Sequence, residues 1–271
     1  MVLAVIETEP LAAQPVLHIG SFEITNTMLF GLITAALTLL ILSIAALRSR
    51  VRPVSRLSYY IESFVEFIWD VAIDSFGSRK KALKHLPLLV ALFAFILISN
   101  LSGLIPGVGM VHTSVDGVDV SLLRPFTTDL NGTLALAILT IGLVQFYAIR
   151  ELGIIGHLKH YFSDKPWRPV NLFIGVNEVF SELLRIVTLS MRLFGVIYAG
   201  EVLIHAIAQL SGNFAWFAVV PVIFLEIFFS AVQAYVFMML TATYLSIATG
   251  SLEHEPENAA VKAKAQLKAT G

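Results

Sequence analysis

Two apolar stretches near the C-terminus limit most strongly what this chain can fold into. They cover Val170–Leu210 and Phe214–Gly250 and are separated only by a short Ser-Gly-Asn link. At 1.5 Å per residue they would form helices of about 60 and 55 Å, whereas about 20 residues cross a membrane. They must therefore break, or cross the membrane very obliquely. Pro221 offers one kink, but no proline follows Pro169 in the first stretch, so we expect an oblique helical hairpin.

The composition places the rest of the chain in a membrane as well. Its 271 residues are 57% hydrophobic and only 14% charged, whereas soluble domains are roughly 45–50% apolar and about 25% charged. Three further charge-free runs are long enough to cross as ordinary helices. These are Ile24–Leu47, Leu86–Ile105 and Leu130–Ile149.

Residues 58–76 have a different pattern. Apolar side chains recur at helical spacing from Ile61 to Phe76, with four acidic residues on the other side. This pattern favours an amphipathic helix on the membrane surface, with a short soluble hairpin element as the alternative. The sequence thus predicts an all-α integral membrane protein with three near-perpendicular transmembrane helices, one surface amphipathic helix and a long oblique C-terminal helical hairpin.

The basic residues set the expected orientation. Of 18 Lys and Arg, eight fall in 48–84, four in 150–168 and three in the final segment, 251–271. The positive-inside rule places these segments in the cytoplasm. We therefore expect an external N-terminal segment over 1–23, a membrane domain over 24–250 and a cytoplasmic tail. The N-terminal segment carries no basic residue up to Gln14, so it lacks the positively charged start of a signal peptide.

Arg192 carries a charge that its own helix does not neutralise. No acidic residue lies three or four positions away on either side. Arginine stays charged, and at the centre of a membrane helix it costs about 2.5–3.5 kcal/mol on insertion scales. We expect its partner to come from another polypeptide, which Gly195 and Ala199 would allow to approach closely. Alternatively, Arg192 pairs with a carboxylate on another helix of this chain and only stabilises the fold.

A second group of charges precedes Arg192 on the same face. Glu178, Glu182 and Arg185 lie close together when successive residues turn by about 100°. Arg185 is three positions from Glu182 and two turns from Glu178. The three can therefore neutralise one another, as buried ions must.

The final hairpin carries further titratable side chains. Glu201 lies on the opposite side of its helix from Arg192, with His205 one turn further on the face of Glu201. In a hairpin Glu201 would face Glu226 across a wet crevice, and such groups can pass protons to water. The alternative is a metal site of Glu201, His205 and Glu226. Polar residues follow one stripe of the second stretch: Glu226, Ser230, Gln233 and Tyr244.

Asp129 and Asn131 open the third run. Both residue types cap helix N-termini well, and a cap role is compatible with lining an external water path. The sequence has no phosphate-binding glycine loop, serine nucleophile motif or H-E-x-x-H motif. It also has no cysteine, which excludes disulfides and thiolate metal sites. We expect neither a cofactor nor a metal. A chain that handles protons without a nucleotide site must leave any ATP chemistry to partners.

Four separated segments resemble subunit a of the F-type ATP synthase. The most specific is Ser190–Glu201, which reads SMRLFGVIYAGE. The similarity covers about residues 24–250 in the family's order. The other matching segments are Gln233–Thr241 with Tyr244–Ser246, Asn100–Pro106 and Asp129–Thr133.

The resemblance implies a membrane stator that meets a rotating ring of small hairpin subunits, each with a membrane carboxylate. Arg192 matches the family's essential arginine, which faces that carboxylate and separates two half-channels. Val196 is a departure, because the family often has asparagine there. Position 226 is histidine in some members. The resemblance assigns Glu201, Glu226 and Gln233 to the outer half-channel, and Glu178 and Arg185 to the inner one.

We therefore expect the proton-translocating stator subunit of a rotary ATP synthase, a non-catalytic channel without a nucleotide site. The implied partners are the rotor ring, which supplies the coupling-ion ligands, peripheral-stalk subunits, the soluble catalytic sector and lipid, but no nucleic acid. The expected location is a bacterial plasma (inner) membrane, with the mitochondrial inner membrane as the alternative. The competing function is a self-contained ion-coupled transporter. An intramembrane hydrolase is disfavoured, since no nucleophile–base pair is present.

Overall fold

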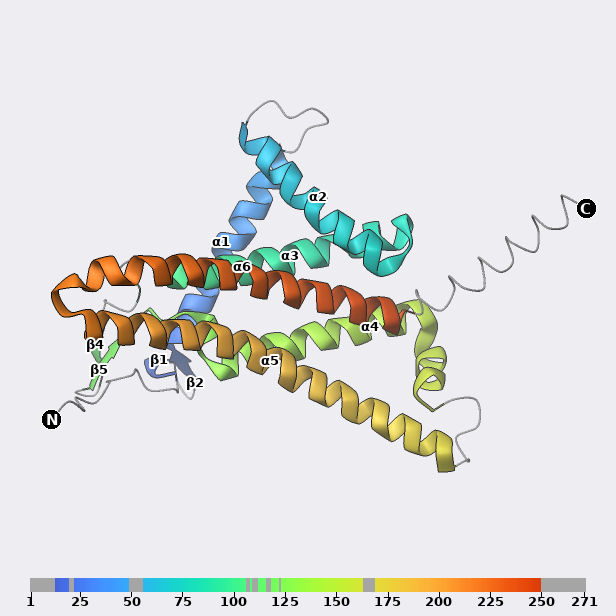
Figure 1. The fold of residues 1–271 in the computed structure, drawn as a ribbon. Helices are drawn as coiled ribbons and strands as arrows, with labels where there is room; N and C mark the ends of the chain where they lie inside the picture. Colours follow the sequence, from blue (N-terminus) through green and yellow to red (C-terminus); the bar gives the residue numbers. More distant parts are fainter. Residues whose placement is uncertain are drawn as a thin grey trace, which may run out of the picture. The chain divides into compact units, whose positions relative to one another are not determined.

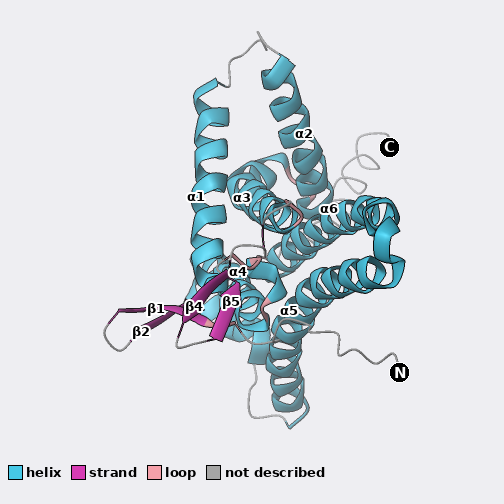
Figure 2. Ribbon diagram, turned by 90° about the vertical axis from the view of Figure 1, so that its left-hand side faces the viewer, coloured by secondary structure: helices cyan, strands magenta, loops and turns pink. Residues whose placement is uncertain are grey.

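The computed structural model describes residues 13–19, 22–48, 56–105, 108, 112–115, 118–121, 123–162 and 169–249. The expected tail and the first 12 residues of the expected external segment lie outside this part. Helices dominate the described chain (Figure 2). Four helical stretches are long and apolar enough to cross a membrane, which confirms an all-α integral membrane protein. They are Asn26–Leu47, Arg79–Gly103, Leu130–Gly153 and Gly175–Ala248.

The three predicted spans correspond to α1 (Asn26–Arg48), α3 (Arg79–Gly103) and α4 (Leu130–Phe162), traced in Figure 1. Two of these helices run beyond their charge-free runs, because Lys, Arg and Glu are good helix formers outside lipid. α3 begins at Arg79, where the Ala82 N–H donates to the Ser78 carbonyl (2.9 Å). α4 continues to Phe162 but is interrupted at Gly153, whose φ of 75° lies in the left-handed region.

The C-terminal hairpin consists of α5 (Pro169–Ser211), the short η2 (Gly212–Phe214) and α6 (Ala215–Ala248). α5 runs unbroken for 43 residues, and α6 remains one helix through Pro221. The link turns at Gly212, with φ of 52°, a value that favours glycine. The helices are therefore continuous, and their oblique crossing of the membrane remains a prediction.

Two short antiparallel strand pairs were missed by the sequence analysis. β1 (Pro15–Ile19) pairs with β2 (Phe22–Thr25), and β4 (His112–Val115) pairs with β5 (Val118–Ser121). Their β-branched and aromatic residues suit strands, but each strand has only four or five residues. Such short runs are hard to separate from loops by their pattern.

The chain forms two compact units, each built from several segments. Unit 1 comprises Met1–Leu47, Ala91–Ala137 and Ile186–Phe237. Within it, Phe126 of η1 (Phe126–Thr128) fits against two glycines. A Cβ built on Gly31 of α1 would lie 2.7 Å from the Phe126 ring, and one on Gly132 of α4 would lie 2.7 Å from its carbonyl oxygen. These small residues let α1 and α4 close around the aromatic ring.

Unit 2 comprises Arg48–Val90, Ile138–Arg185 and Met238–Gly271. Its centre is His85 of α3, which is fully buried. The imidazole stacks on Phe76 of α2 (Arg56–Phe76), with centroids 5.1 Å apart, and meets Tyr147 of α4 edge-on at 5.0 Å. Three helices are therefore joined through one side chain.

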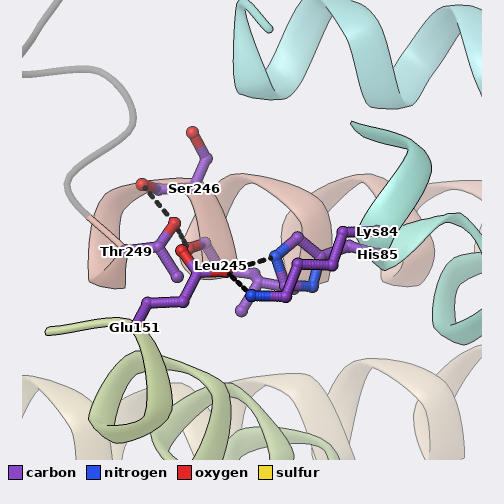
Figure 3. Close-up of polar contacts among 6 residues, drawn as sticks. All are labelled: Lys84, His85, Glu151, Leu245, Ser246 and Thr249. Carbon is purple, nitrogen blue, oxygen red and sulfur yellow. Dashed lines mark hydrogen bonds and ion pairs between the residues drawn. The ribbon is translucent and has the colours of Figure 1, made fainter. Parts of the chain in front are cut away.

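Glu151 completes this junction from α4. Its Oε1 lies 2.6 Å from Lys84 Nζ and 3.1 Å from His85 Nε2 (Figure 3). The expected amphipathic pattern of α2 is visible here, since Ile68, Ala72 and Phe76 are buried. The acidic side chains on its other side are exposed: Glu62, Glu66, Asp70 and Asp74.

Replacing Glu151 with glutamine should weaken the α3–α4 junction. The variant keeps the shape but leaves Lys84 and the buried His85 without an anionic partner. We expect a loss of about 1–2 kcal/mol in the free energy of unfolding, limited because Lys84 is half exposed. Thermal unfolding of the purified chain in detergent measures it. Glu66→Gln is the control, because Glu66 is exposed and makes no hydrogen bond or ion pair with another described residue. Equal stability of both variants would contradict the prediction.

Candidate functional site

Arg192 lies on the uncovered side of α5 in unit 1. Leu189, Leu193 and Ile197, four residues apart, form the buried side of the helix, so Arg192 points away from the core and is exposed. It makes no hydrogen bond or ion pair with another described residue. The alternative was that Arg192 pairs with a carboxylate on another helix of this chain. Within the described residues, the structure shows no such carboxylate paired with Arg192.

The surface beside Arg192 is small and open. Gly195 and Ala199 are exposed, and a Cβ built on Gly195 meets nothing within 4 Å. The described chain itself places no helix against this glycine. Another helix could approach closely at this surface, as the spacing of small residues predicts.

The opposite side of α5 packs against α6. In unit 1 the two helices run side by side from the hairpin link (Figure 1). Glu226 of α6 is only 5% exposed, and its carboxylate fills the space that a Cβ on Gly200 would occupy. Gly200 thus admits the carboxylate beside α5, one position before Glu201.

Buried polar groups continue from Glu226 along α6. Ser230 and Gln233 are also buried. Neither Ser230 Oγ nor Gln233 Nε2 has a hydrogen-bond partner among the described residues. Buried polar atoms of this kind are normally satisfied by ordered water. The stripe can therefore hold water beside a carboxylate.

His205 does not join this group. Its side chain is exposed, and Nδ1–H donates to the Glu201 backbone carbonyl at 2.9 Å. No group of three or more His, Cys, Asp and Glu within the described ranges could hold a metal ion. The alternative of a metal site at Glu201, His205 and Glu226 gains no support.

The second group of charges lies in unit 2. Arg185 Nη2 is 3.8 Å from Glu178 Oε1, an ion pair at the spacing of two turns. The guanidinium also lies over the Tyr244 ring, with Cζ 4.8 Å from its centroid. Tyr244 shares a stripe with Glu226 in sequence, but the structure places it beside Arg185.

Glu182 has a partner that sequence reasoning missed. Gln145 of α4 donates a hydrogen bond from Nε2 to Glu182 Oε1. The sequence did carry a sign of this contact, because Gln145 is a polar residue within a charge-free apolar run. Such a residue normally faces another polar group. Three helices therefore contribute to this group: α4 through Gln145, α5 through its three charges, and α6 through Tyr244.

Asp129 caps α4 as expected. The side chain is 4% exposed, and Oδ1 accepts the Asn131 backbone N–H at 3.1 Å. Oδ2 accepts the Thr27 hydroxyl of α1 at 3.0 Å. Asn131 supplies the capped N–H, and its own side chain is exposed, so the cap role belongs to Asp129.

The chain is similar in sequence to known proteins over most of its length. The family model described as ATP synthase A chain matches residues 28–246. ATP synthase subunit a of Moorella thermoacetica is 32% identical over 231 residues, covering 85% of this chain and 94% of that protein. The subunit a of Campylobacter concisus is 33% identical over 227 residues, covering 83% and 91%. The chain belongs to the ATP synthase A chain family.

Membership makes the protein a component of the membrane sector of an ATP synthase. The matched region includes α2 to α5 and nearly all of α1 and α6. It therefore contains Arg192, the Glu226 stripe and the group around Arg185. The candidate sites lie within the part of the chain that defines the family.

A pair of glycine variants tests the close packing of Glu226. Gly200→Ala should destabilise the purified chain by about 1–3 kcal/mol, because the added methyl group overlaps a buried carboxylate. Gly195→Ala on the same helix is the control. It should leave stability unchanged or raise it, since its Cβ meets open space and alanine favours helices. Thermal unfolding in detergent compares them, and similar midpoints would show that Glu226 does not pack against Gly200.

Proposed function

We propose that this chain is the proton-conducting stator subunit of a rotary ATP synthase, with Arg192 facing the membrane carboxylate of a rotor subunit. The exposed position of Arg192 carries the proposal. Its guanidinium lies on an apolar helix without a hydrogen bond or ion pair to another described residue. The charges around Arg185, by contrast, have partners within the chain. The positive charge of Arg192 is therefore compensated by the carboxylate of a rotor subunit that moves past it.

The chemistry of such an encounter follows from the cost of charge in lipid. A carboxylate that crosses hydrocarbon must be protonated, since its ionised form would be strongly disfavoured there. Beside Arg192 the ionised form is stabilised by the opposite charge. The acid therefore releases a proton near Arg192 and must regain one before it re-enters lipid. Each proton that crosses about 100 mV supplies about 2.3 kcal/mol.

We propose two proton paths. The rotor acid loses its proton into one of them and regains a proton from the other. Glu226, Ser230 and Gln233, together with Glu201, form the outer path, and Asp129 with Asn131 lines its entrance. The inner path uses Glu178, Glu182 and Arg185, which share unit 2 with the basic start of α3, Arg79–Lys84. The positive-inside rule assigns that basic segment to the cytoplasm. His205 and Tyr244 are also assigned to these paths.

The remaining assignments follow from the same proposal. The N-terminus lies outside, the C-terminus lies in the cytoplasm, and the membrane is a bacterial plasma membrane, in keeping with the bacterial relatives. The partners are the rotor ring, the peripheral-stalk subunits and the soluble catalytic sector. ATP chemistry belongs to that sector, because this chain has no nucleotide motif.

Substitution of Arg192 should abolish coupling without preventing assembly. Arg192→Ala is expected to lower proton-driven ATP synthesis by about 100-fold or more, because a desolvated charge pair is lost. Arg192→Lys should also be poor, since a compact ammonium lacks the delocalised, weakly hydrated guanidinium. Synthesis is measured in membrane vesicles and assembly by copurification of the complex. Arg150→Ala, at an exposed arginine of α4, is the control. Normal synthesis in Arg192→Ala vesicles would reject the proposal.

Replacing either carboxylate of the outer path should reduce proton flux less than replacing Arg192 reduces ATP synthesis. Glu226→Gln and Glu201→Gln keep the shape but remove a group that can exchange a proton. We expect each to slow ATP-driven proton pumping about tenfold, as general acid–base groups typically contribute 10²–10⁴ and water can replace part of this. Fluorescence quenching of a pH dye in inverted vesicles follows the pumping. Wild-type pumping by the double variant would remove both residues from the path.

A further inference from the structure

We propose that one hydrogen bond between α4 and α5 fixes the rotation of α5 and thereby keeps Arg192 facing the rotor. The bond joins Thr133 of α4 to Ser190 of α5, two residues before Arg192. The inference rests on the proposed function, which supplies the need for an arginine held in one direction. Thr133 and Ser190 are positioning residues, because they act through Arg192.

The Thr133–Ser190 bond is buried and directional. Thr133 is 0% and Ser190 1% exposed, and their hydroxyl oxygens lie 3.3 Å apart. The Thr133 hydroxyl donates to the Leu130 carbonyl of its own helix at 3.1 Å, so the Ser190 hydroxyl donates to Thr133 Oγ1. Among the described residues, Thr133 is the only hydrogen-bond partner of the Ser190 side chain. A shift of α5 by one residue, about 1.5 Å and 100°, would break the bond.

Ser190 and Arg192 lie on opposite sides of α5, since two residues turn a helix by about 200°. Leu189 and Leu193 are buried on the side of Ser190, whereas Met191 and Arg192 are exposed. Rotation of α5 about its axis would displace the hydrogen bond and the guanidinium together. A bond that holds Ser190 in place therefore sets the direction of Arg192.

The Thr133 end of the bond belongs to a part of α4 that α1 holds in place. Before α4, Asp129 accepts the Thr27 hydroxyl of α1 at 3.0 Å. The Thr133 backbone N–H donates to the Asp129 carbonyl at 3.1 Å. The Phe126 ring also packs against a glycine of α1 and a glycine of α4. Through Thr133, Ser190 is thus attached to two helices of unit 1.

A hydrogen bond suits this task better than apolar packing does. A rotor acid that passes Arg192 attracts the guanidinium and so exerts a turning force on α5. Apolar contacts are non-directional, and lipid supplies no hydrophobic force between helices. A hydrogen bond weakens steeply when its angle is distorted. The Thr133–Ser190 bond therefore opposes rotation of α5 from the side opposite Arg192.

The first experiment removes the two hydroxyl groups within the complete complex, in inverted membrane vesicles. The variants are Ser190→Ala, Thr133→Val, both together, and Thr133→Ser, which keeps the hydroxyl. The readout is the number of protons pumped per ATP hydrolysed. A loss of folded complex lowers both rates equally and leaves this ratio unchanged, whereas a turned Arg192 lets rotor acids pass without a completed proton transfer. Thr38→Val is the matched control, because the buried Thr38 hydroxyl of α1 donates to its own helix at 2.7 Å.

We expect Ser190→Ala and Thr133→Val each to lower the ratio about fivefold, the effect of one ordinary hydrogen bond. The double variant should lie within about twofold of either single variant, because both changes remove the same bond. Thr133→Ser and Thr38→Val should both keep the wild-type ratio. Wild-type ratios in Ser190→Ala and Thr133→Val would overturn the inference.

The second experiment tests whether α5 stays fixed on α4 during turnover. The chain has no cysteine, so Thr133→Cys with Ser190→Cys places its only two thiols at the positions of the bonded hydroxyls. Oxidation with copper phenanthroline should join them, since a small adjustment brings the two sulfur atoms to the disulfide distance of about 2.0 Å. Thr133→Cys with Met191→Cys is the control pair and should stay reduced, because Met191 is exposed on another side of the helix. Labelling of free thiols in denaturant distinguishes the two pairs.

The disulfide should leave the pumping ratio unchanged, because a fixed α5 makes no movement that it could block. The inference is overturned if the Thr133–Ser190 pair does not cross-link, if the control pair cross-links equally, or if the cross-linked enzyme pumps only after reduction. Should Thr133→Val fail to assemble, Ser190→Ala and the disulfide decide. Failure of the proposed function looks different, because Arg192→Ala would then leave pumping unchanged. Normal dependence on Arg192 with a wild-type ratio in Ser190→Ala removes only the role of the Thr133–Ser190 bond.

Discussion

The cost of holding charge in hydrocarbon governs how polar side chains are distributed over the long helices. An ionised group in lipid is disfavoured by several kcal/mol unless something nearby compensates for it. Around Arg185 the compensation is local, through Glu178 and the Tyr244 ring. Arg192, two turns further along α5, is exposed and receives no hydrogen bond or ion pair from the described chain. This difference between the two arginines underlies the proposal that Arg192 meets a partner subunit.

Small residues decide where carboxylates can enter the hairpin. Gly200 leaves room for the Glu226 carboxylate directly against α5, so an acid is buried between two apolar helices. The same residue type at Gly195 leaves an open surface beside Arg192. One glycine therefore serves contact within the chain, while the other is available for contact with another helix. Both follow from the absence of a Cβ atom, which lets helix backbones or polar groups approach closely.

The acids of this chain are held by side chains and backbone groups of other helices. Glu151 is fixed by Lys84 and His85 at the junction of α3 and α4. Glu182 is held by an amide from α4, and Asp129 by a hydroxyl and a backbone N–H. These acids link helices that lie far apart in the sequence: Glu151 joins α3 to α4, Glu182 joins α5 to α4, and Asp129 joins α1 to the start of α4.

The sequence alone determined that this is an integral membrane protein, because the length of an apolar run can be compared directly with the thickness of a bilayer. It predicted the positions of α1, α2, α5 and α6 to within about two residues at each end, the usual uncertainty of helix boundaries. It also singled out Arg192, since a missing partner within one helix can be read from spacing. α3 and α4 extend beyond their predicted ends, because charge limits a membrane span but does not stop helical hydrogen bonding.

Only the tertiary structure decided which polar groups meet. The Gln145–Glu182 contact joins residues 37 apart in sequence, and His85 meets Glu151 across 66 positions. Likewise, Tyr244 lies beside Arg185, and His205 bonds to its own helix instead of facing Glu226. Periodicity assigns a residue to a face of its helix, but the neighbour on that face depends on how helices rotate and approach. That choice is made by packing of small and large side chains across the interface, which no single segment encodes.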